Sequence, residues 1–305
     1  MNPDQYLLTS PKVAKLLNVH ESSIKRWCNS GELPTQTTEG GHRRISWTAF
    51  QEFSDTRELS HPYTPFKKEA LMVYLGHQQL LKKNQPLSLQ ETIQTWMSRN
   101  ELCYIAPLLL LVLNETKWNY SYIFDNILFP SLKQVGQWWL NGKITTSDEH
   151  RISQEWQQGL IISRFHIHKN IEFSHKPLKA IVACSEENTH EIACHCLRLI
   201  LEYRGIEVIF LGARVPTSDL IKAQLHYRTE LVCVSYSPYN KVKDIELAHE
   251  TLSNNYDPFR PYALAFGGVP LKGWNPPKNK SPFLHEGTFS DMIFFEKWLD
   301  EWHSS

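Results

Sequence analysis

The sequence predicts a multidomain protein of mixed α and α/β class, because three different residue patterns follow one another along its 305 residues. Turn residues and short apolar groups crowd residues 6–53, which is typical of a small unit with short helices and a hairpin. From 67 to about 172, apolar residues recur at spacings of three and four residues, as in helices. From 177 onward, short apolar runs alternate with helical stretches, which indicates a parallel sheet covered by helices. A chain of this length accommodates two or three domains.

Composition excludes several classes of protein. The chain has 41% apolar residues, which argues against disorder. It has 32 Lys+Arg against 32 Asp+Glu, which argues against a surface that is basic throughout. The longest apolar run, 105–113, contains Pro107 and is too short to span a membrane. The amino terminus lacks the features of a signal peptide. Six scattered cysteines are typical of reduced cytosolic thiols, so we expect a cytoplasmic protein without a membrane partner.

The amino-terminal residues 1–58 predict a winged helix-turn-helix. Two short helices near 10–17 and 21–28 precede a hairpin at 35–44 and a helix from 47, and the proline-containing stretch 59–66 is the expected linker. Residues 1–66 have seven basic and seven acidic side chains, yet the basic ones cluster on the second helix and the hairpin tip. We expect these positions to contact DNA: Ser22, Ser23, Lys25, Arg26, His42, Arg43 and Arg44.

The amino-acid sequence of this segment is similar to that of the MerR/excisionase type of winged helix. The similarity rests on TSPKVAKLLNVHESSIKRWCNSGELP followed by TEGGHRRISWTAFQEF. It implies sequence-specific binding to double-stranded operator DNA, usually as a dimer. A simpler interpretation of the GGHRR stretch alone is that Arg43 and Arg44 are solvated hairpin residues.

Residues 67–174 predict a helical bundle with helices near 67–83, 88–98, 101–115, 119–140 and 147–170. Two residues near the turn between the last two helices have ordinary interpretations. Trp139 is a large apolar side chain that covers the end of the bundle, and Thr146 with Glu149 forms a T-x-x-E capping box.

Residues 175–305 predict a Rossmann-like (flavodoxin-like) domain with strands near 179–184, 205–212, 230–235 and 262–266 and a further possible strand at 283–285. Ligands of open parallel sheets bind beyond the carboxyl ends of the strands. His190, Ser235, Gly267 and Gly268 all follow or end strands there, so we expect them on one rim. Taken singly, each has a structural interpretation: a solvated histidine, a satisfied serine and a glycine turn.

The spacing of these residues resembles that of the cobalamin-binding domain of methionine synthase and its relatives, whose signature is D-x-H-x-x-G, S-x-L and G-G. Here 41 residues separate the first block from Ser235-Tyr236-Ser237, and 29 more precede the glycine pair. The resemblance implies that His190 ligates cobalt from below and that the nucleotide tail lies beside Ser235, Ser237 and the glycines. The sequence departs at Asn188, where an aspartate is usual, at Ala193 and at Ser237. An asparagine is a weaker partner for the imidazole than a carboxylate.

Trp139, nine residues and Glu149-His150 resemble the W-x9-E-H signature of light-responsive cobalamin regulators, the CarH/LitR group, which has the same domain order. The resemblance implies that Trp139, Glu149 and His150 cover the upper face of the cofactor. Some members have a histidine directly after the tryptophan that takes the upper axial position after photolysis. Here that residue is Leu140, which cannot bind cobalt.

The resemblance implies a transcriptional repressor, not an enzyme, that uses adenosylcobalamin or another cobalamin as a light-sensing cofactor. The dark form would assemble as a homo-oligomer, a dimer or tetramer, on its operator, and light would release it. Two alternatives remain open. One is a regulator without cobalamin, favoured by Asn188, Ala193 and Leu140. The other is a corrinoid methyl carrier, against which the helix-turn-helix argues.

Overall fold

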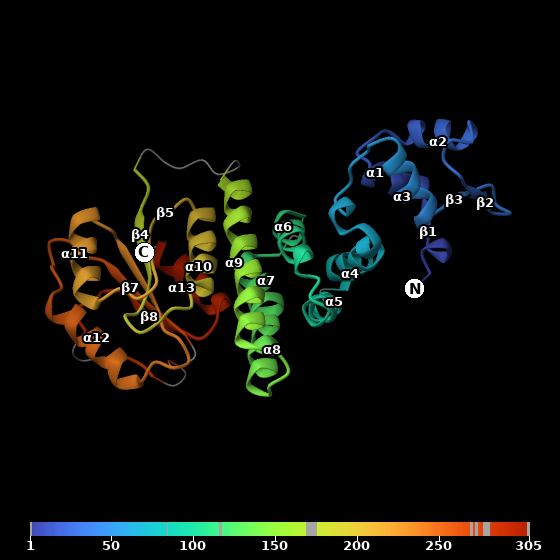
Figure 1. The fold of residues 1–305 in the computed structure, drawn as a ribbon. Helices are drawn as coiled ribbons and strands as arrows, with labels where there is room; N and C mark the ends of the chain where they lie inside the picture. Colours follow the sequence, from blue (N-terminus) through green and yellow to red (C-terminus); the bar gives the residue numbers. More distant parts are fainter. Residues whose placement is uncertain are drawn as a thin grey trace. The chain divides into compact units, whose positions relative to one another are not determined.

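The computed structural model describes residues 2–83, 85–115, 118–168, 176–268, 271, 274–276 and 281–303. It contains a helix-turn-helix, a helical region and a five-stranded parallel sheet with flanking helices, as the sequence predicts (Figure 1). The chain divides into two compact units, Met1–Thr92 and Ile93–Ser305. Among the described residues, no helix has the length and apolar character that a bilayer crossing requires.

The first unit begins with a winged helix-turn-helix. A three-stranded antiparallel sheet has the order β1-β3-β2, so the wing hairpin is extended by a strand that the sequence did not predict. The His20 ring caps the second helix by accepting a hydrogen bond from the Ser22 N–H. The elements are η1 (Pro3–Gln5), β1 (Leu7–Thr9), α1 (Ser10–Leu16), α2 (Glu21–Asn29), β2 (Gln36–Thr37), β3 (Arg43–Ser46) and α3 (Trp47–Thr56).

The stretch 59–66 is packed onto this unit and is not the linker that the sequence predicts. His61, Tyr63 and Phe66 are buried, and the Tyr63 ring lies 6.4 Å from Trp47 and 5.2 Å from Tyr74. Aromatic burial outweighs the turn-forming prolines here, and η2 (Thr64–Glu69) and α4 (Ala70–Lys83) continue the same unit. The division of the chain falls inside α5 (Leu87–Ser98), later than predicted.

The helical part of the second unit lies beside the sheet (Figure 1). Its long helix α9 packs closely on α6, because a Cβ atom on Gly159 would lie 3.2 Å from the Ala106 backbone. The elements are η3 (Leu102–Tyr104), α6 (Ile105–Glu115), α7 (Tyr120–Ile123), the π-helical turn η4 (Phe124–Leu128), α8 (Phe129–Leu140) and α9 (Thr146–His168). The predicted boundary at 174–175 lies outside the described residues.

The sheet has the order β5-β4-β6-β7-β8, and every neighbouring pair is parallel. The strand order reverses between β4 and β6, which is the topological switch point where such folds bind ligands. Helices α11 and α12 cover one face, and α10 and α13 cover the other (Figure 1). The elements are β4 (Lys179–Cys184), α10 (Ile192–Tyr203), β5 (Glu207–Gly212), α11 (Thr217–Tyr227), β6 (Leu231–Ser235), α12 (Val242–Asn254), β7 (Ala263–Gly267), β8 (Glu286–Phe289) and α13 (Met292–His303).

Polar contacts join the helical part to the sheet part within this second unit. The Asp125 carboxylate, in the π-helical turn, accepts hydrogen bonds from the first N–H groups of α13, those of Met292 and Ile293, at 3.0 and 2.9 Å. The Arg164 guanidinium of α9 pairs with the buried Glu202 carboxylate of α10 at 2.7 Å. Because hydrogen bonds and an ion pair tie the two parts together, the space between them has defined walls.

Candidate functional site

A cavity of about 840 Å³ lies in the second unit, between α8 and α9 on one side and the carboxyl ends of the strands on the other. Its volume is at the upper end of the range for small-molecule sites. The structure brings together around this cavity all nine residues that the sequence predicts for cofactor binding: Trp139, Glu149, His150, Asn188, His190, Ser235, Ser237, Gly267 and Gly268.

The floor of the cavity is made of small residues on neighbouring strands. Cys233 pairs with Ala265, and Ser235 pairs with Gly267, across β6 and β7. Residues two apart on a strand point to the same face, so these four positions form one shallow patch. Burial raises the pKa of the Cys233 thiol, so it stays neutral. Sequence reasoning missed Cys233 and Ala265, because the register between the strands is not visible in the sequence.

Gly268 occupies a position that no other residue can take without strain. Its φ of +137° is outside the range that L side chains adopt, and a Cβ atom there would lie 2.1 Å from the Tyr236 carbonyl oxygen. Gly267 has ordinary space around its Cβ position, with the Phe289 carbonyl at 3.9 Å. The second glycine of the pair is therefore required by the backbone, and the first keeps the floor open.

Two buried polar residues hold the loops at the rim. The Asn188 amide donates to the Ser235 carbonyl and accepts from the His190 N–H, both at 2.9 Å. The Ser237 hydroxyl donates to Asn240 Oδ1 at 3.1 Å. The sequence-based expectation that Asn188 partners the His190 imidazole is wrong in this structure, because both ends of its amide are bonded to main-chain groups.

His190 presents an exposed imidazole at the mouth of the cavity. Its ring centroid lies 6.2 Å from that of Tyr239, and within the described part of the chain its ring nitrogens have no hydrogen-bond partner. A neutral imidazole with a free nitrogen is a good ligand for a transition metal. His190 is therefore placed so that it can ligate a metal carried by a bound molecule.

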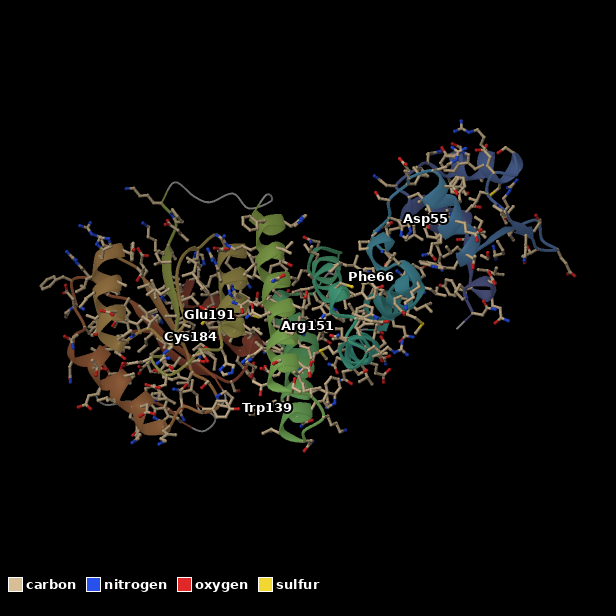
Figure 2. All side chains as sticks on the ribbon, viewed as in Figure 1. Asp55, Phe66, Trp139, Arg151, Cys184 and Glu191 are labelled. Carbon is tan, nitrogen blue, oxygen red and sulfur yellow. The ribbon has the colours of Figure 1, made fainter. Side chains whose placement is uncertain are left out.

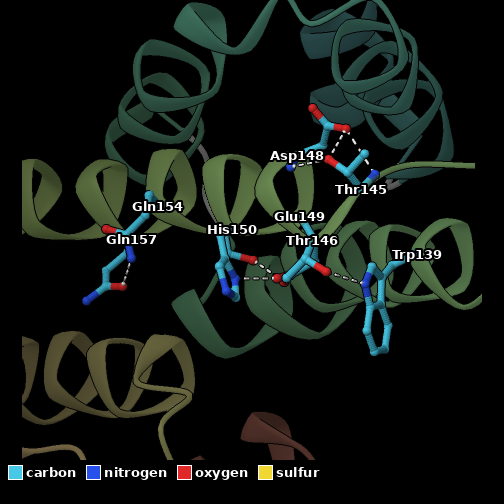
Figure 3. Close-up of polar contacts among 9 residues, drawn as sticks. Trp139, Thr145, Thr146, Asp148, Glu149, His150, Gln154 and Gln157 are labelled. Carbon is cyan, nitrogen blue, oxygen red and sulfur yellow. Dashed lines mark hydrogen bonds and ion pairs between the residues drawn. The ribbon is translucent and has the colours of Figure 1, made fainter. Parts of the chain in front are cut away.

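The helical wall carries an aromatic ring and a network of polar side chains (Figure 3). Trp139 Nε1 donates to Thr146 Oγ1 at 3.2 Å, and the indole is 39% exposed. Glu149 accepts hydrogen bonds from Ser153 at 2.8 Å and from His150 Nδ1 at 2.7 Å. Figure 2 shows Trp139 near the end of α8, on the side of the sheet. A flat ring next to a carboxylate is suited to a nucleoside or a similar group.

The predicted capping box at Thr146 and Glu149 is wrong by one residue. Thr145 N–H donates to Asp148 Oδ2 at 3.0 Å, and Asp148 N–H donates to Thr145 Oγ1 at 3.2 Å, so these two residues cap α9 (Figure 3). Hydrogen bonds from Thr145 lower the pKa of the Asp148 carboxyl. Because the cap uses Asp148, the carboxylate of Glu149 is left for the cavity.

Leu140 ends α8, is 74% exposed and is not one of the lining residues. The other lining residues of α8 recur at three and four positions before Trp139, so they share its face of the helix. This periodicity is the signal that would have found them from the sequence: Phe129, Leu132, Lys133 and Gly136. Residues of α13 also line the cavity, and no sequence signal marked them: Met292 and Phe295.

The candidate DNA interface lies in the first unit, on α2 and the wing. Ser22, Lys25 and Arg26 are exposed and Ser23 is half-buried on α2. Lys25 forms an ion pair with Glu21 at 3.0 Å. On the wing, His42 is exposed, and Arg43 and Arg44 are half-buried.

Arg43 also connects the two elements of this surface. Its Nη2 donates to Asn29 Oδ1, at the end of α2, at 2.7 Å. The bond fixes the wing arginine relative to the helix, so the two basic clusters form one surface.

Comparisons with known proteins agree with this architecture. Residues 7–57 match a family model described as a helix-turn-helix domain. The HTH-type transcriptional repressor CarH of Myxococcus xanthus is 32% identical to this chain over 123 residues, which is 40% of this chain and 40% of that repressor. The match therefore spans less than half of the length of this curated relative.

The solved structure of the monomethylamine corrinoid protein of Methanosarcina barkeri is similar in fold. It is 14% identical, covers 68% of this chain and 95% of its own, and has a TM-score of 0.51. The chain thus combines a helix-turn-helix domain with the fold of a corrinoid protein. The resemblance to CarH-type regulators that the motifs predict is confirmed by these three comparisons.

Proposed function

We propose that this protein is a DNA-binding transcriptional regulator, a repressor, whose Ile93–Ser305 unit binds a cobalamin. One observation carries the proposal: nine residues chosen from their spacing in the sequence, on the loops and ends of separate elements, all line one cavity. These residues come from five separate short segments of the chain, and the fold brings all five to the same cavity. The cofactor we propose first is adenosylcobalamin.

The residues present fit a corrinoid. His190 would ligate the cobalt from the sheet side, since its ring nitrogens are free of hydrogen bonds within the described residues. The small floor at Ser235 and Gly267 would accept the nucleotide tail. Gly268 provides the close backbone approach. A corrinoid bound through these contacts would occupy the cavity beside the sheet.

The helical wall would cover the upper face of the macrocycle. Trp139 would stack on the adenosyl group, Glu149 would accept a ribose hydroxyl, and His150 would hold Glu149 in place through their 2.7 Å contact. Bound adenosylcobalamin supplies a cobalt–carbon bond that light can break. Loss of the upper group would change what α8 and α9 contact, and this change would shift the assembly of the regulator on DNA, as a dimer or tetramer.

The test is to mix purified apoprotein with adenosylcobalamin in the dark, desalt it, and record the visible spectrum and elution volume before and after green light. We expect retained corrinoid and a light-dependent change in molecular size. Retention without a size change would leave a sensor of vitamin supply. No retention would support the alternative of a regulator that works without cobalamin.

His190→Ala should weaken retention at least tenfold, because the proposed bond to the metal is lost. The matched control is His226→Ala, an exposed histidine of α11 that does not line the cavity. Equal retention by both variants would contradict the assignment of His190.

The DNA-binding half of the proposal is tested separately. Duplexes selected from a random pool by the full chain should lose binding when Arg43 and Arg44 are replaced by alanine. Ser22, Ser23, Lys25, Arg26 and His42 complete the proposed contact surface. The control is Lys82→Ala, an exposed lysine outside the matched helix-turn-helix. Cofactor uptake should be unchanged in both variants.

A corrinoid methyl carrier is the second candidate, because the solved structure of similar fold is that of a corrinoid protein. The helix-turn-helix favours the regulator over the carrier. Methyl transfer from the loaded protein to a partner enzyme, with no selection of DNA from a random pool, would favour the carrier.

A further inference from the structure

Asn188 lies in the loop after β4 and is 1% exposed. All of its polar groups are bonded to main-chain atoms. Its Oδ1 accepts from the His190 N–H at 2.9 Å, and its Nδ2 donates to the Ser235 carbonyl at 2.9 Å. Its own N–H donates to the Ser185 carbonyl at 2.8 Å. The side chain therefore joins the loop of His190 to the end of β6.

The orientation of this amide is determined by its partners. A backbone N–H can only donate and a backbone carbonyl can only accept, so the oxygen must face His190 and the nitrogen must face Ser235. Rotating the amide by half a turn would place like groups against each other on both sides. The arrangement needs one acceptor and one donor in a single short side chain, which asparagine supplies and aspartate does not.

The imidazole of His190 is left out of this arrangement. Asn188 holds the backbone of residue 190, whereas the ring of His190 lies against Tyr239, at 6.2 Å between ring centroids. The position of the loop and the chemistry of the ring are thus controlled by different residues. Asn188 can therefore place the ring at the cavity mouth without bonding to either ring nitrogen.

We propose that Asn188 is a positioning residue that places His190 through the main chain, and that it requires both halves of its amide. The part of this proposal that concerns a corrinoid rests on the proposed function. A carboxylate at position 188 would keep the acceptor for the His190 N–H but would face the Ser235 carbonyl with a second acceptor. Asn188→Asp should therefore weaken cofactor binding rather than improve it.

The matched control is Gln224, a second buried amide in the same domain. It is 4% exposed, donates to the Thr229 carbonyl at 3.2 Å and the Arg260 carbonyl at 3.4 Å, and does not line the cavity. Gln224→Ala removes a comparable amide clamp at a different place. Any effect that Asn188→Ala and Gln224→Ala share is a general loss of stability.

The first experiment measures amide hydrogen exchange of the full-length apoprotein, without any cofactor. The His190 amide should exchange about tenfold faster in Asn188→Ala, because it loses its acceptor. It should stay protected in Asn188→Asp and in Gln224→Ala. Unchanged exchange in Asn188→Ala would overturn the proposal, and this result does not depend on whether a corrinoid binds.

The second experiment loads each variant with adenosylcobalamin in the dark and records retention and the visible spectrum after desalting. Asn188→Ala and Asn188→Asp should each lower retention about tenfold and shift the remaining corrinoid toward the spectrum without an imidazole ligand. Gln224→Ala should keep the wild-type spectrum. Retention by Asn188→Asp equal to or above wild type would overturn the proposal, because the side chain at 188 would then act by hydrogen bonding to the His190 imidazole. Failure of the wild type itself to retain corrinoid would refute the proposed function, while the exchange experiment would still decide the role of Asn188.

Discussion

The two compact units differ in how their interiors are filled. In Met1–Thr92 the core is packed with rings: Trp47 lies 5.0 Å from Tyr74 and 5.3 Å from Phe50 between centroids. In Ile93–Ser305 the sheet keeps a cavity of about 840 Å³ beside its strand ends. We expect the first unit to bind its partner through its surface and the second unit to bind a ligand in its cavity. The two should therefore respond to different perturbations.

Acidification should affect the first unit most. Burial lowers the pKa of His61 to about 4, although Asp55 opposes the shift, and burial lowers the pKa of His77 to about 4. Both histidines stay neutral in the folded state while the unfolded chain takes up protons below its ordinary value near 6.5. Stability is therefore full above pH 6.5 and falls as the pH drops toward 4, by about 3 kcal/mol for each histidine. Segment-resolved hydrogen exchange of the full chain at several pH values measures this loss.

His77→Leu should remove about half of this pH dependence in the first unit. The control is His226→Gln, at an exposed histidine of the second unit. It should leave the pH dependence of the stability of both units unchanged. The second unit also contains His195, whose pKa is lowered by burial, so its own slope is not zero. Equal pH slopes in the two units would contradict the comparison.

Gly268→Ala should both destabilise the second unit and damage its cavity. The positive φ and the 2.1 Å approach to the Tyr236 carbonyl both oppose a side chain. We expect a loss of about 3 kcal/mol in urea unfolding, together with loss of corrinoid retention. Gly205→Ala is the control, because its φ of +76° has no atoms within 4 Å of a Cβ. That variant should lose about 1–2 kcal/mol and keep the cofactor.

Ala265→Val tests the cavity without strain. The added methyl groups enter open space, so the apoprotein should change by less than about 1 kcal/mol, whereas retention should fall more than tenfold. The control is Ala180→Val, at a fully buried position of β4 that does not line the cavity. It should affect stability and not retention. It should cost about 1–3 kcal/mol through overpacking and leave retention by the folded protein unchanged. Similar behaviour of the two variants would mean that the floor is not part of the site.

The elements of the second unit were predictable because their patterns are local. The apolar run 179–184 is the strand β4, and the helices around Trp139 follow from apolar spacing. Three of the site residues were predictable because the carboxyl ends of parallel strands lie at the same edge of a sheet. His190, Ser235 and Gly267 each follow or end a different strand, and all of them line the cavity.

What could not be predicted depends on contacts between distant residues. The pairing of Cys233 with Ala265 is set by the register of β6 and β7. Two overlapping capping patterns start at Thr145 and Thr146, and in the structure Asp148 caps the helix while Glu149 bonds to His150 and Ser153. The burial of Tyr63 against Tyr74 turned an expected linker into core. In each case the local signal is compatible with two structures.

The smallest expected effect lies on the surface of the first unit, where Arg26 and Lys25 are neighbours with different surroundings. Lys25 is paired with Glu21 at 3.0 Å, whereas the Arg26 guanidinium has no hydrogen bond or ion pair among the described residues. If α2 approaches DNA phosphates, Arg26→Ala should lower the slope of log affinity against log salt by about 0.9 on a mixed-sequence duplex.

Lys25→Ala should change that slope less, because Lys25 must first give up its contact with Glu21, and its removal leaves an acidic side chain facing the DNA. Glu21→Ala should then strengthen binding slightly, since it releases Lys25 and removes a negative charge. Such exposed pairs are worth at most about 1 kcal/mol, so the changes are expected to be several-fold rather than a loss of binding. Slopes equal to that of the wild type in both alanine variants would place α2 away from the phosphates and leave the wing arginines as the contact.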